Sequence, residues 1–177
     1  MRKKFDFLSG HFVSVTLLVL LGASMRIIPH PDNFTPLTGI ALFAGAQLLN
    51  PFAALAVAMG SLLLSDLFLG FYSIMPVVYG AFGLMILVGR KLGPNPSLFW
   101  VTMAALGSGL LFFMLTNFAV WAFEDMYPKT LAGLTQCFTM AIPFYRATIA
   151  GDLIFSLGLF TLVKILKFVP ARARLQA

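Results

Sequence analysis

Charged residues are scarce in this sequence, because they account for 10% of its 177 residues while hydrophobic residues account for 60%. A soluble domain carries about 25% charged residues, so this chain has too few polar groups to cover a globule that faces water. The composition therefore predicts an integral membrane protein. The length suits one compact helical domain that spans residues 1–177.

Cysteine is nearly absent as well, since Cys137 is the only one in the chain. A single cysteine cannot form an internal disulfide, and neither a CxxC pair nor a Cys/His zinc spacing occurs. We therefore expect no structural metal site and no cofactor.

Catalytic signatures are missing too: the sequence contains no GxSxG, no HExxH and no Walker A lysine loop. We therefore expect a protein that is not an enzyme. A membrane-embedded enzyme stays open as an alternative, because catalytic groups that are far apart in sequence can assemble in space.

Long apolar runs dominate the chain, and a bilayer core needs about 20 apolar residues per helix. They predict an all-α bundle of six transmembrane helices, of which the second is clearly short, at residues 8–28, 37–49, 52–70, 73–89, 98–122 and 143–168. The segment 123–142 is too polar to span. We expect its "LAGLTQCF" to form a short helix that lies at the outer surface or folds back over the bundle.

The formal net charge of +6 suggests a nucleic-acid partner at first sight, but the basic residues lie at the ends of apolar runs, which indicates membrane orientation instead. Six helices place both termini on one side. That side holds nine basic residues: Arg2, Lys3, Lys4, Arg90, Lys91, Lys164, Lys167, Arg172 and Arg174. The other side holds Arg26, Lys129 and Arg146. This bias predicts cytoplasmic termini in a bacterial inner membrane, with the lipid bilayer rather than nucleic acid as partner.

Asp66 and Asp152 are the clearest charged residues inside predicted helices, and Arg26 lies late in the first one. A charge within the hydrocarbon costs about 2.5–3.5 kcal/mol on insertion scales, so such groups mark ion pairs or functional sites. In each of these three helices, the charged residue lies in the half toward the outer side of the membrane. One hypothesis is that Arg26 pairs with one of the two aspartates and holds the bundle together. The other is that these groups line an outward-facing pocket, and both can be true.

Other polar and aromatic groups gather in the same outer half. His30 lies between two prolines, either as a loop residue with a satisfied ring or as a ligand contact. Cys137 is either a small apolar residue or a soft ligand to a metal-bearing substrate such as a corrinoid. Several aromatic residues there would suit any flat ring. The candidate substrate-binding residues are Arg26, His30, Asn33, Phe34, Asp66, Tyr72, Asn117, Trp121, Tyr127, Lys129, Cys137, Arg146 and Asp152.

Five motifs carry a family resemblance: "RIIPHPDNFTPL" (26–37), "LLLSDLFLGFY" (62–72), "TNFAVW" (116–121), "YPKTLAGL" (127–134) and "AIPFYRATIAGDLIF" (141–155). With them the chain resembles an uncharacterised bacterial family of six-helix membrane proteins. Its size, topology and loop placement also look like the substrate-binding S components of energy-coupling factor (ECF) vitamin transporters.

The resemblance to S components implies a six-helix membrane protein with an outward-facing pocket that binds a small vitamin or cofactor for uptake, a cobalamin-type compound included. It also implies a membrane coupling protein and two cytoplasmic ATPases as partners. Such coupling proteins dock on small residues of the first helix, where Gly10 and Ser14 have that spacing here. Two alternatives remain open: an enzyme or lipid-handling protein that uses Asp66, Asp152 or His30, and a non-transporting accessory subunit.

Overall fold

The computed structural model describes the backbone of residues 2–168 and the side chains of residues 15–166. This part of the chain folds into six helices: α1 Arg2–Ile27, α2 Leu37–Gln47, α3 Pro51–Leu69, α4 Met75–Leu92, α5 Leu98–Phe123 and α6 Leu131–Phe168. The predicted all-α class and the predicted number of helices are confirmed for the described residues.

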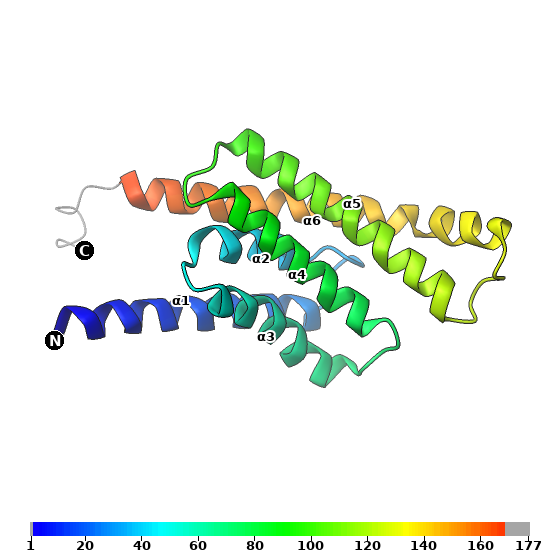
Figure 1. Ribbon diagram of the computed structural model, residues 1–177, viewed down its shortest axis with the longest axis horizontal. Helices are drawn as coiled ribbons and strands as arrows, with labels where there is room; N and C mark the ends of the chain where they lie inside the picture. Colours follow the sequence, from blue (N-terminus) through cyan, green and yellow to red (C-terminus); the bar gives the residue numbers. More distant parts are fainter. Residues whose placement is uncertain (1, 169–177) are drawn as a thin grey trace.

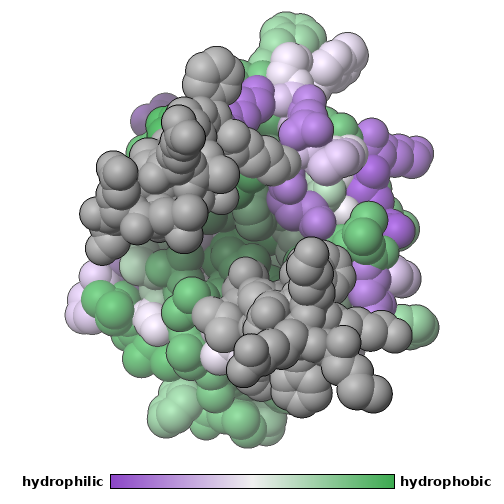
Figure 2. Space-filling model, turned by 90° about the vertical axis from the view of Figure 1, so that its left-hand side faces the viewer, coloured by the Kyte–Doolittle hydropathy of each residue, from purple (hydrophilic) through white to green (hydrophobic). Residues whose placement is uncertain are grey.

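Successive helices run in alternating directions along the long axis of the molecule (Figure 1). The start of α1 and the end of α6 therefore lie at the same end (Figure 1). The loops 28–36, 70–74 and 124–130 lie toward the opposite end, which we call the distal end. Seen from the end where α1 begins, hydrophilic residues gather along one edge of the molecule, and apolar residues make up much of the rest of the coloured surface (Figure 2).

The short helix α2 forms the centre of the bundle and contacts all five of the other helices. Its sequence is hydrophobic on every side, as expected for a buried helix, and most of its residues are buried. Small residues allow the close approach: a Cβ on Gly45 would lie 2.2 Å from the carbonyl oxygen of Ile86, and one on Gly89 would lie 2.2 Å from that of Leu42. These two glycines therefore fix how α2 and α4 cross.

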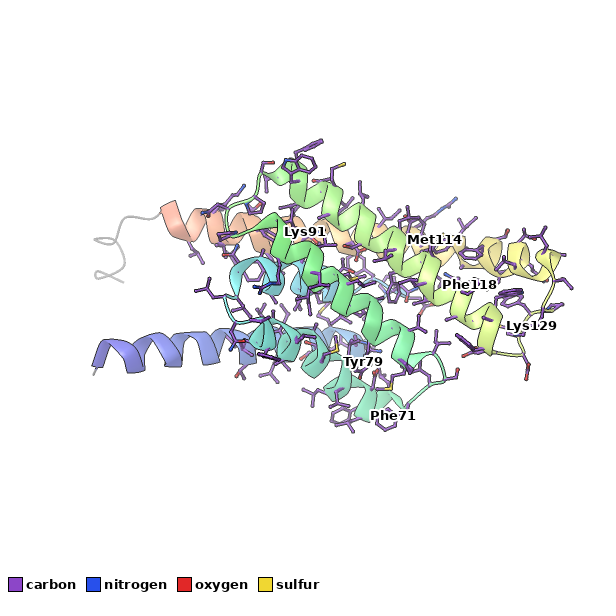
Figure 3. The ribbon with its side chains drawn as sticks, viewed as in Figure 1. Phe71, Tyr79, Lys91, Met114, Phe118 and Lys129 are labelled. Atoms are coloured by element: carbon purple, nitrogen blue, oxygen red, sulfur yellow. The ribbon has the colours of Figure 1, made fainter. Side chains whose placement is uncertain are left out.

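Within residues 15–166, four helices are long and apolar enough to cross a membrane: α3, α4, α5 and α6, the last counted over Leu131–Leu166. Large apolar side chains such as Leu67 and Phe68 on α3 are exposed, and a bilayer would cover them. The chain is therefore a multi-pass membrane protein. Lys91 lies toward the end where α1 begins, and Lys129 lies at the distal end (Figure 3).

The last helix differs from the predicted arrangement. Residues 131–142, predicted as a separate outer segment, belong to α6, which continues through Pro143 to Phe168. The helix starts at Leu131 because the Thr130 hydroxyl accepts a hydrogen bond from the Gly133 amide at 3.1 Å, as an N-cap does. A proline removes one backbone bond of a helix, but packing against a neighbour keeps membrane helices continuous, and α6 packs along α5.

Two other predictions concern residues that lie wholly or partly outside the described part of the chain. The surroundings of Gly10 and Ser14, the predicted docking pair, lie outside the described side chains, although their backbone belongs to α1. The basic tail with Arg172 and Arg174 lies outside the described residues.

Candidate binding cavity

A cavity of about 320 Å³ lies in the distal half of the bundle, and residues from all six helices line it. Leu37 and Thr38, the first two residues of α2, form part of its wall. At 1.5 Å per residue α2 is only about 16 Å long, against a hydrocarbon core of about 30 Å. The shortness of α2 therefore leaves the space in which the cavity lies.

The loop 28–36 closes one side of the cavity, and its sequence explains its shape. Asn33 has a φ of 62°, a left-handed conformation that asparagine adopts more readily than most residues. The Phe34 ring packs on Phe155 of α6 with centroids 5.5 Å apart. A Cβ on Gly151 would approach the Thr35 backbone nitrogen to 3.2 Å. The loop therefore rests on α6 and holds Asn33 and Thr35 at the cavity wall.

Arg26 and Asp66 form an ion pair between α1 and α3, with Arg26 Nη1 2.6 Å from Asp66 Oδ1. The same nitrogen donates to the Ser65 hydroxyl at 2.5 Å and to the Leu62 carbonyl at 3.3 Å. Tyr79 of α4 donates its hydroxyl to Asp66 Oδ2 at 2.9 Å. Asp66 is fully buried, and both of its oxygens have partners. Arg26 also lines the cavity, so the ion pair links the two helices and holds Arg26 at the cavity wall.

Tyr72, in the loop between α3 and α4, lies beside this network. Burial raises the pKa of Tyr72 above its ordinary value, and the nearby Asp66 carboxylate raises it further. Its side chain is also hydrogen-bonded to Arg26. The phenol therefore stays protonated at neutral pH and presents a neutral ring and hydroxyl to the cavity.

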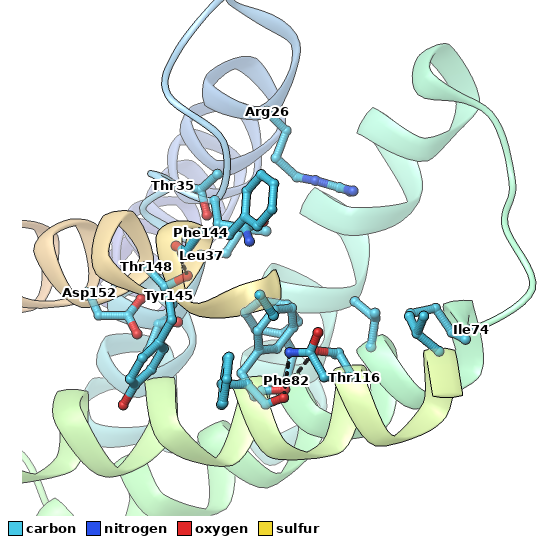
Figure 4. Close-up of a pocket in the computed structure, with 18 of the residues that line it drawn as sticks. Arg26, Thr35, Leu37, Ile74, Phe82, Thr116, Phe144, Tyr145, Thr148 and Asp152 are labelled. Carbon is cyan, nitrogen blue, oxygen red and sulfur yellow. Dashed lines mark hydrogen bonds between the residues drawn. The ribbon is translucent and has the colours of Figure 1, made fainter. Parts of the chain in front are cut away.

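Asp152 of α6 lines the cavity from another side than Arg26 (Figure 4). It is 3% exposed and hydrogen-bonds the Thr38 side chain. Its Oδ2 atom is buried and has no hydrogen-bond partner among the residues that the structure describes. A Cβ on Gly109 of α5 would lie 2.5 Å from Oδ2, so glycine is what leaves room for this carboxylate. A buried polar atom without a partner needs an explanation.

Three further polar side chains of the wall direct their donors to their own helices. Thr116 donates to the Phe112 carbonyl at 2.8 Å, Asn117 Nδ2 to the Phe113 carbonyl at 2.8 Å, and Thr148 to the Phe144 carbonyl at 3.1 Å. Dashed lines in Figure 4 mark such bonds. A hydroxyl that has donated its proton can only accept further bonds, whereas Asn117 keeps its amide oxygen as an acceptor and one N–H as a donor.

Aromatic rings make up much of the rest of the wall: Tyr72, Phe82, Phe112, Phe113, Phe144 and Tyr145. The Phe113 and Tyr145 rings lie with centroids 4.6 Å apart, and the Phe82 and Phe112 rings 5.5 Å apart. Rigid aromatic walls with a few convergent polar groups are typical of sites that bind small molecules.

A second hollow adjoins the cavity at the distal end and shares Arg26, Asn33, Thr35 and Phe144 with it. We call it the distal hollow. It adds His30, Asp32 and Leu69 to the lining. Nδ1 of His30 lies 2.8 Å from the Pro31 carbonyl oxygen, so Nδ1 carries the proton of this bond, and the buried Nε2 has no partner.

The structure thus brings many of the predicted site residues together. Arg26, Asn33, Tyr72, Asn117 and Asp152 line the cavity. His30 lines the distal hollow, and Asp66 lies behind Arg26 as its ion-pair partner. The remaining predicted residues do not line the cavity: Phe34, Trp121, Tyr127, Lys129, Cys137 and Arg146.

Some of these residues outside the cavity have structural roles instead. Lys129 donates to the backbone carbonyls of Trp121 and Glu124, which places a cation at the C-terminal end of α5. The Trp121 ring nitrogen donates to the Pro128 carbonyl at 3.0 Å. These bonds fix the loop between α5 and α6, so the side chains of Lys129 and Trp121 serve that loop and not the cavity.

Cys137 is buried, and its sulfur lies 3.4 Å from the Asn117 backbone oxygen. It therefore lies behind the wall that Asn117 contributes, and it does not share a cavity with His30. This placement matches the first hypothesis for Cys137, a small apolar residue, better than the hypothesis of a ligand to a metal-bearing substrate.

Sequence reasoning missed several residues of the wall, chiefly Thr116, Thr148, Phe144 and Tyr145. Their helical spacing was a usable signal. In α6, Ala141, Tyr145, Thr148 and Asp152 lie four, three and four residues apart, which places them on one face. Starting from the buried carboxylate, this periodicity predicts the other three.

The fold and the cavity define a multi-pass α-helical membrane protein with an internal cavity that has polar and aromatic walls. The chain belongs to DUF6580, a family of unknown function, which it matches over residues 8–174. No curated protein and no solved structure shows significant similarity to the chain. The predicted membership of a membrane protein family is confirmed at this level, and the resemblance to ECF S components stays a prediction.

Proposed function

We propose that this protein is a substrate-binding subunit for uptake of a small vitamin or cofactor, similar in its role to ECF S components. The observation that carries the proposal is the cavity itself: its wall combines Arg26, Asp152 and six aromatic rings inside a membrane bundle. Charged groups at this depth are expensive, so a protein that keeps them beside an empty space gains from what binds there.

The direction of transport in this proposal rests on charge. Arg90, Lys91 and Lys164 belong to the end of the bundle where α1 begins and α6 ends, whereas Arg26 and Lys129 belong to the distal half. This sorting supports cytoplasmic termini in a bacterial inner membrane. The cavity and the distal hollow then face outward, as binding before uptake requires. A coupling protein with two ATPases would supply the energy, or the subunit acts without them.

The size of the cavity limits the range of substrates that fit. A volume of about 320 Å³ equals about ten water molecules at liquid density, which is at the lower end of ligand pockets. A compound of one or two rings fits this space. A whole corrinoid is much larger, so the volume favours a small vitamin or cofactor over a cobalamin-type one.

Asp66 is one of the residues on which the alternative functions rest. It is held by both Arg26 and Tyr79, so it is not free to act as a catalytic base. The polar groups of the wall also suit a compact polar molecule better than an acyl chain. We therefore favour binding for uptake over an enzyme, a lipid-handling protein or an accessory subunit.

Native mass spectrometry of the purified protein tests the proposal with two matched variants of α6. Ala141→Phe places a ring in the cavity, because Ala141 lines it. Ala150→Phe makes the same change at an exposed position of α6 outside that lining. We expect a small molecule to co-purify with the wild type and Ala150→Phe but not with Ala141→Phe. Cells that carry the wild-type gene should accumulate the labelled form of that molecule.

Two results would overturn this proposal. If no small molecule accompanies the wild type, or if Ala141→Phe carries the same molecules as Ala150→Phe, the cavity is not a binding site. If the molecule binds but expressing cells accumulate none of it, the function in uptake is wrong even though binding is correct.

A further inference from the structure

The charges around the cavity do not balance. The charge of Arg26 is already compensated, because Asp66 pairs with it at 2.6 Å. Among the described residues, Asp152 takes part in no ion pair, and its Oδ2 has no hydrogen-bond partner. The acidic side chain of the cavity wall that lacks a counter-charge is therefore Asp152. Ionising a buried carboxyl is costly unless a partner of opposite sign joins it.

The neutral polar groups point to the same kind of partner. Thr116 and Thr148 have given their hydroxyl protons to carbonyls of their own helices, and Asn117 has given an amide proton in the same way. What the two hydroxyls still offer to the cavity are acceptor atoms, and Asn117 offers its amide oxygen besides one remaining N–H. The wall around Asp152 is therefore richer in acceptors than in donors, and this favours a ligand that brings donors.

The aromatic rings add a third constraint, independent of hydrogen bonding. Phe113 and Tyr145 lie against each other at 4.6 Å, and both line the cavity. The face of an aromatic ring carries partial negative charge and attracts cations, most strongly where water is excluded. Flat rings also stack well on such side chains.

We propose, building on the binding function proposed above, that the cavity selects a flat aromatic cation that presents two or more N–H donors, such as an amidine or a protonated amino-heterocycle. Asp152 Oδ2 receives one donor, and the acceptors of Thr116, Asn117 and Thr148 are available to the others. The bonds from Arg26 to α3 all leave from Nη1. An N–H of Arg26 that is used neither there nor by Tyr72 can bind an acceptor at another edge of the ligand.

Three probes of nearly equal size and shape test this assignment: benzamidine, which is cationic, benzamide, which is neutral, and benzoate, which is anionic. Each is added to the purified protein in detergent, and the affinity follows from the concentration dependence of the melting temperature. We expect benzamidine to bind about tenfold more tightly than benzamide, because a charge-assisted hydrogen bond is about twice as strong as a neutral one. Benzoate should bind most weakly.

Two variants of α6 locate the effect. Asp152→Asn should remove the advantage of benzamidine over benzamide. Ser156→Ala is the matched control, because Ser156 is buried one turn further along and its hydroxyl also lacks a partner, yet it does not line the cavity. It should preserve the order of the three probes. Should Asp152→Asn not fold, Thr148→Val removes another acceptor and should weaken benzamidine more than benzamide.

The outcomes separate this proposal from the proposed function. If benzamide or benzoate binds as tightly as benzamidine, or if none of the three binds, the cation assignment is overturned. The proposed function still stands in that case if native mass spectrometry finds a molecule that Ala141→Phe excludes. If that molecule is absent as well, both proposals fail.

Discussion

Asp66 and Asp152 are two buried aspartates on two membrane helices, and they differ in what surrounds them. Asp66 has a partner for each oxygen: Arg26 at 2.6 Å for Oδ1 and Tyr79 at 2.9 Å for Oδ2. The Asp152 carboxylate is hydrogen-bonded to the Thr38 side chain, and its Oδ2 has no partner among the described residues. The first carboxylate is satisfied within the protein, and the second keeps an oxygen that, in our proposal, accepts a bond from a ligand.

This difference teaches how the same residue type serves stability in one place and binding in another. A fully paired buried carboxylate stabilises contacts between helices, but breaking the pair leaves a lone charge. An unpaired one weakens the empty protein and strengthens the occupied one. Such a conflict between stability and function is common at binding sites, and it makes the two positions separable by experiment.

The largest expected effect concerns the paired aspartate. Asp66→Asn leaves Arg26 without its counter-charge and should lower the free energy of unfolding by about 3–5 kcal/mol. The double variant Arg26→Gln/Asp66→Asn should lose less than the two single variants added together. Asp125→Asn, at an exposed position, is the control and should change stability by less than about 0.5 kcal/mol. Additive losses in the denaturant titrations would show that the two charges are not coupled.

A smaller effect should follow from Tyr79→Phe, which removes the second hydrogen bond to Asp66. Hydrogen bonds to charged groups contribute about 1.5–3 kcal/mol, so the free energy of unfolding should fall by about that amount. Because Tyr79 does not line the cavity, benzamidine affinity should stay within a factor of about two of the wild type. A large loss of affinity with unchanged stability would place Tyr79 in the binding site and contradict this account.

The third variant moves the carboxylate of Asp152 without replacing the residue. In Gly109→Ala the new Cβ would lie 2.5 Å from Oδ2, and the carboxylate must turn away. We expect affinity for benzamidine to fall about tenfold, which corresponds to about 1.4 kcal/mol.

Gly107→Ala is the matched control for this variant, because a Cβ there meets nothing within 4 Å. It should leave affinity unchanged and raise stability by up to about 1 kcal/mol through helix propensity. Equal affinity in both alanine variants would show that the position of the Asp152 carboxylate does not matter.

The comparison also shows how far the sequence alone reaches. Apolar runs and their charged interruptions predict the helices and mark Arg26, Asp66 and Asp152 as special. They do not tell which aspartate pairs with Arg26, because that depends on helix neighbours: α1 packs against α3, and this places Asp66 within reach. Both hypotheses drawn from the sequence, a pair and a cavity wall, describe Arg26 correctly.

Other features depend on contacts that a local pattern does not contain. In the sequence, Pro143 predicts a helix boundary. In the structure α6 continues through Pro143, because α5 packs alongside it. Lys129 reads as a candidate ligand contact, yet it binds the carbonyls at the end of α5. The cavity itself follows from the shortness of α2, and the sequence predicts that short length. The sequence does not predict the central position of α2 among the five other helices.

The most direct test of the central claim is the stability of ligand-free Asp152→Asn beside that of ligand-free Asp66→Asn. The measurement is the free energy of unfolding of both variants and the wild type in the same detergent, after bound small molecules have been removed. If Asp152 is held for a ligand, its asparagine variant unfolds at the same or a higher free energy than the wild type, while Asp66→Asn loses several kcal/mol. A comparable loss in both variants would mean that Asp152 is a structural residue and that the account is wrong.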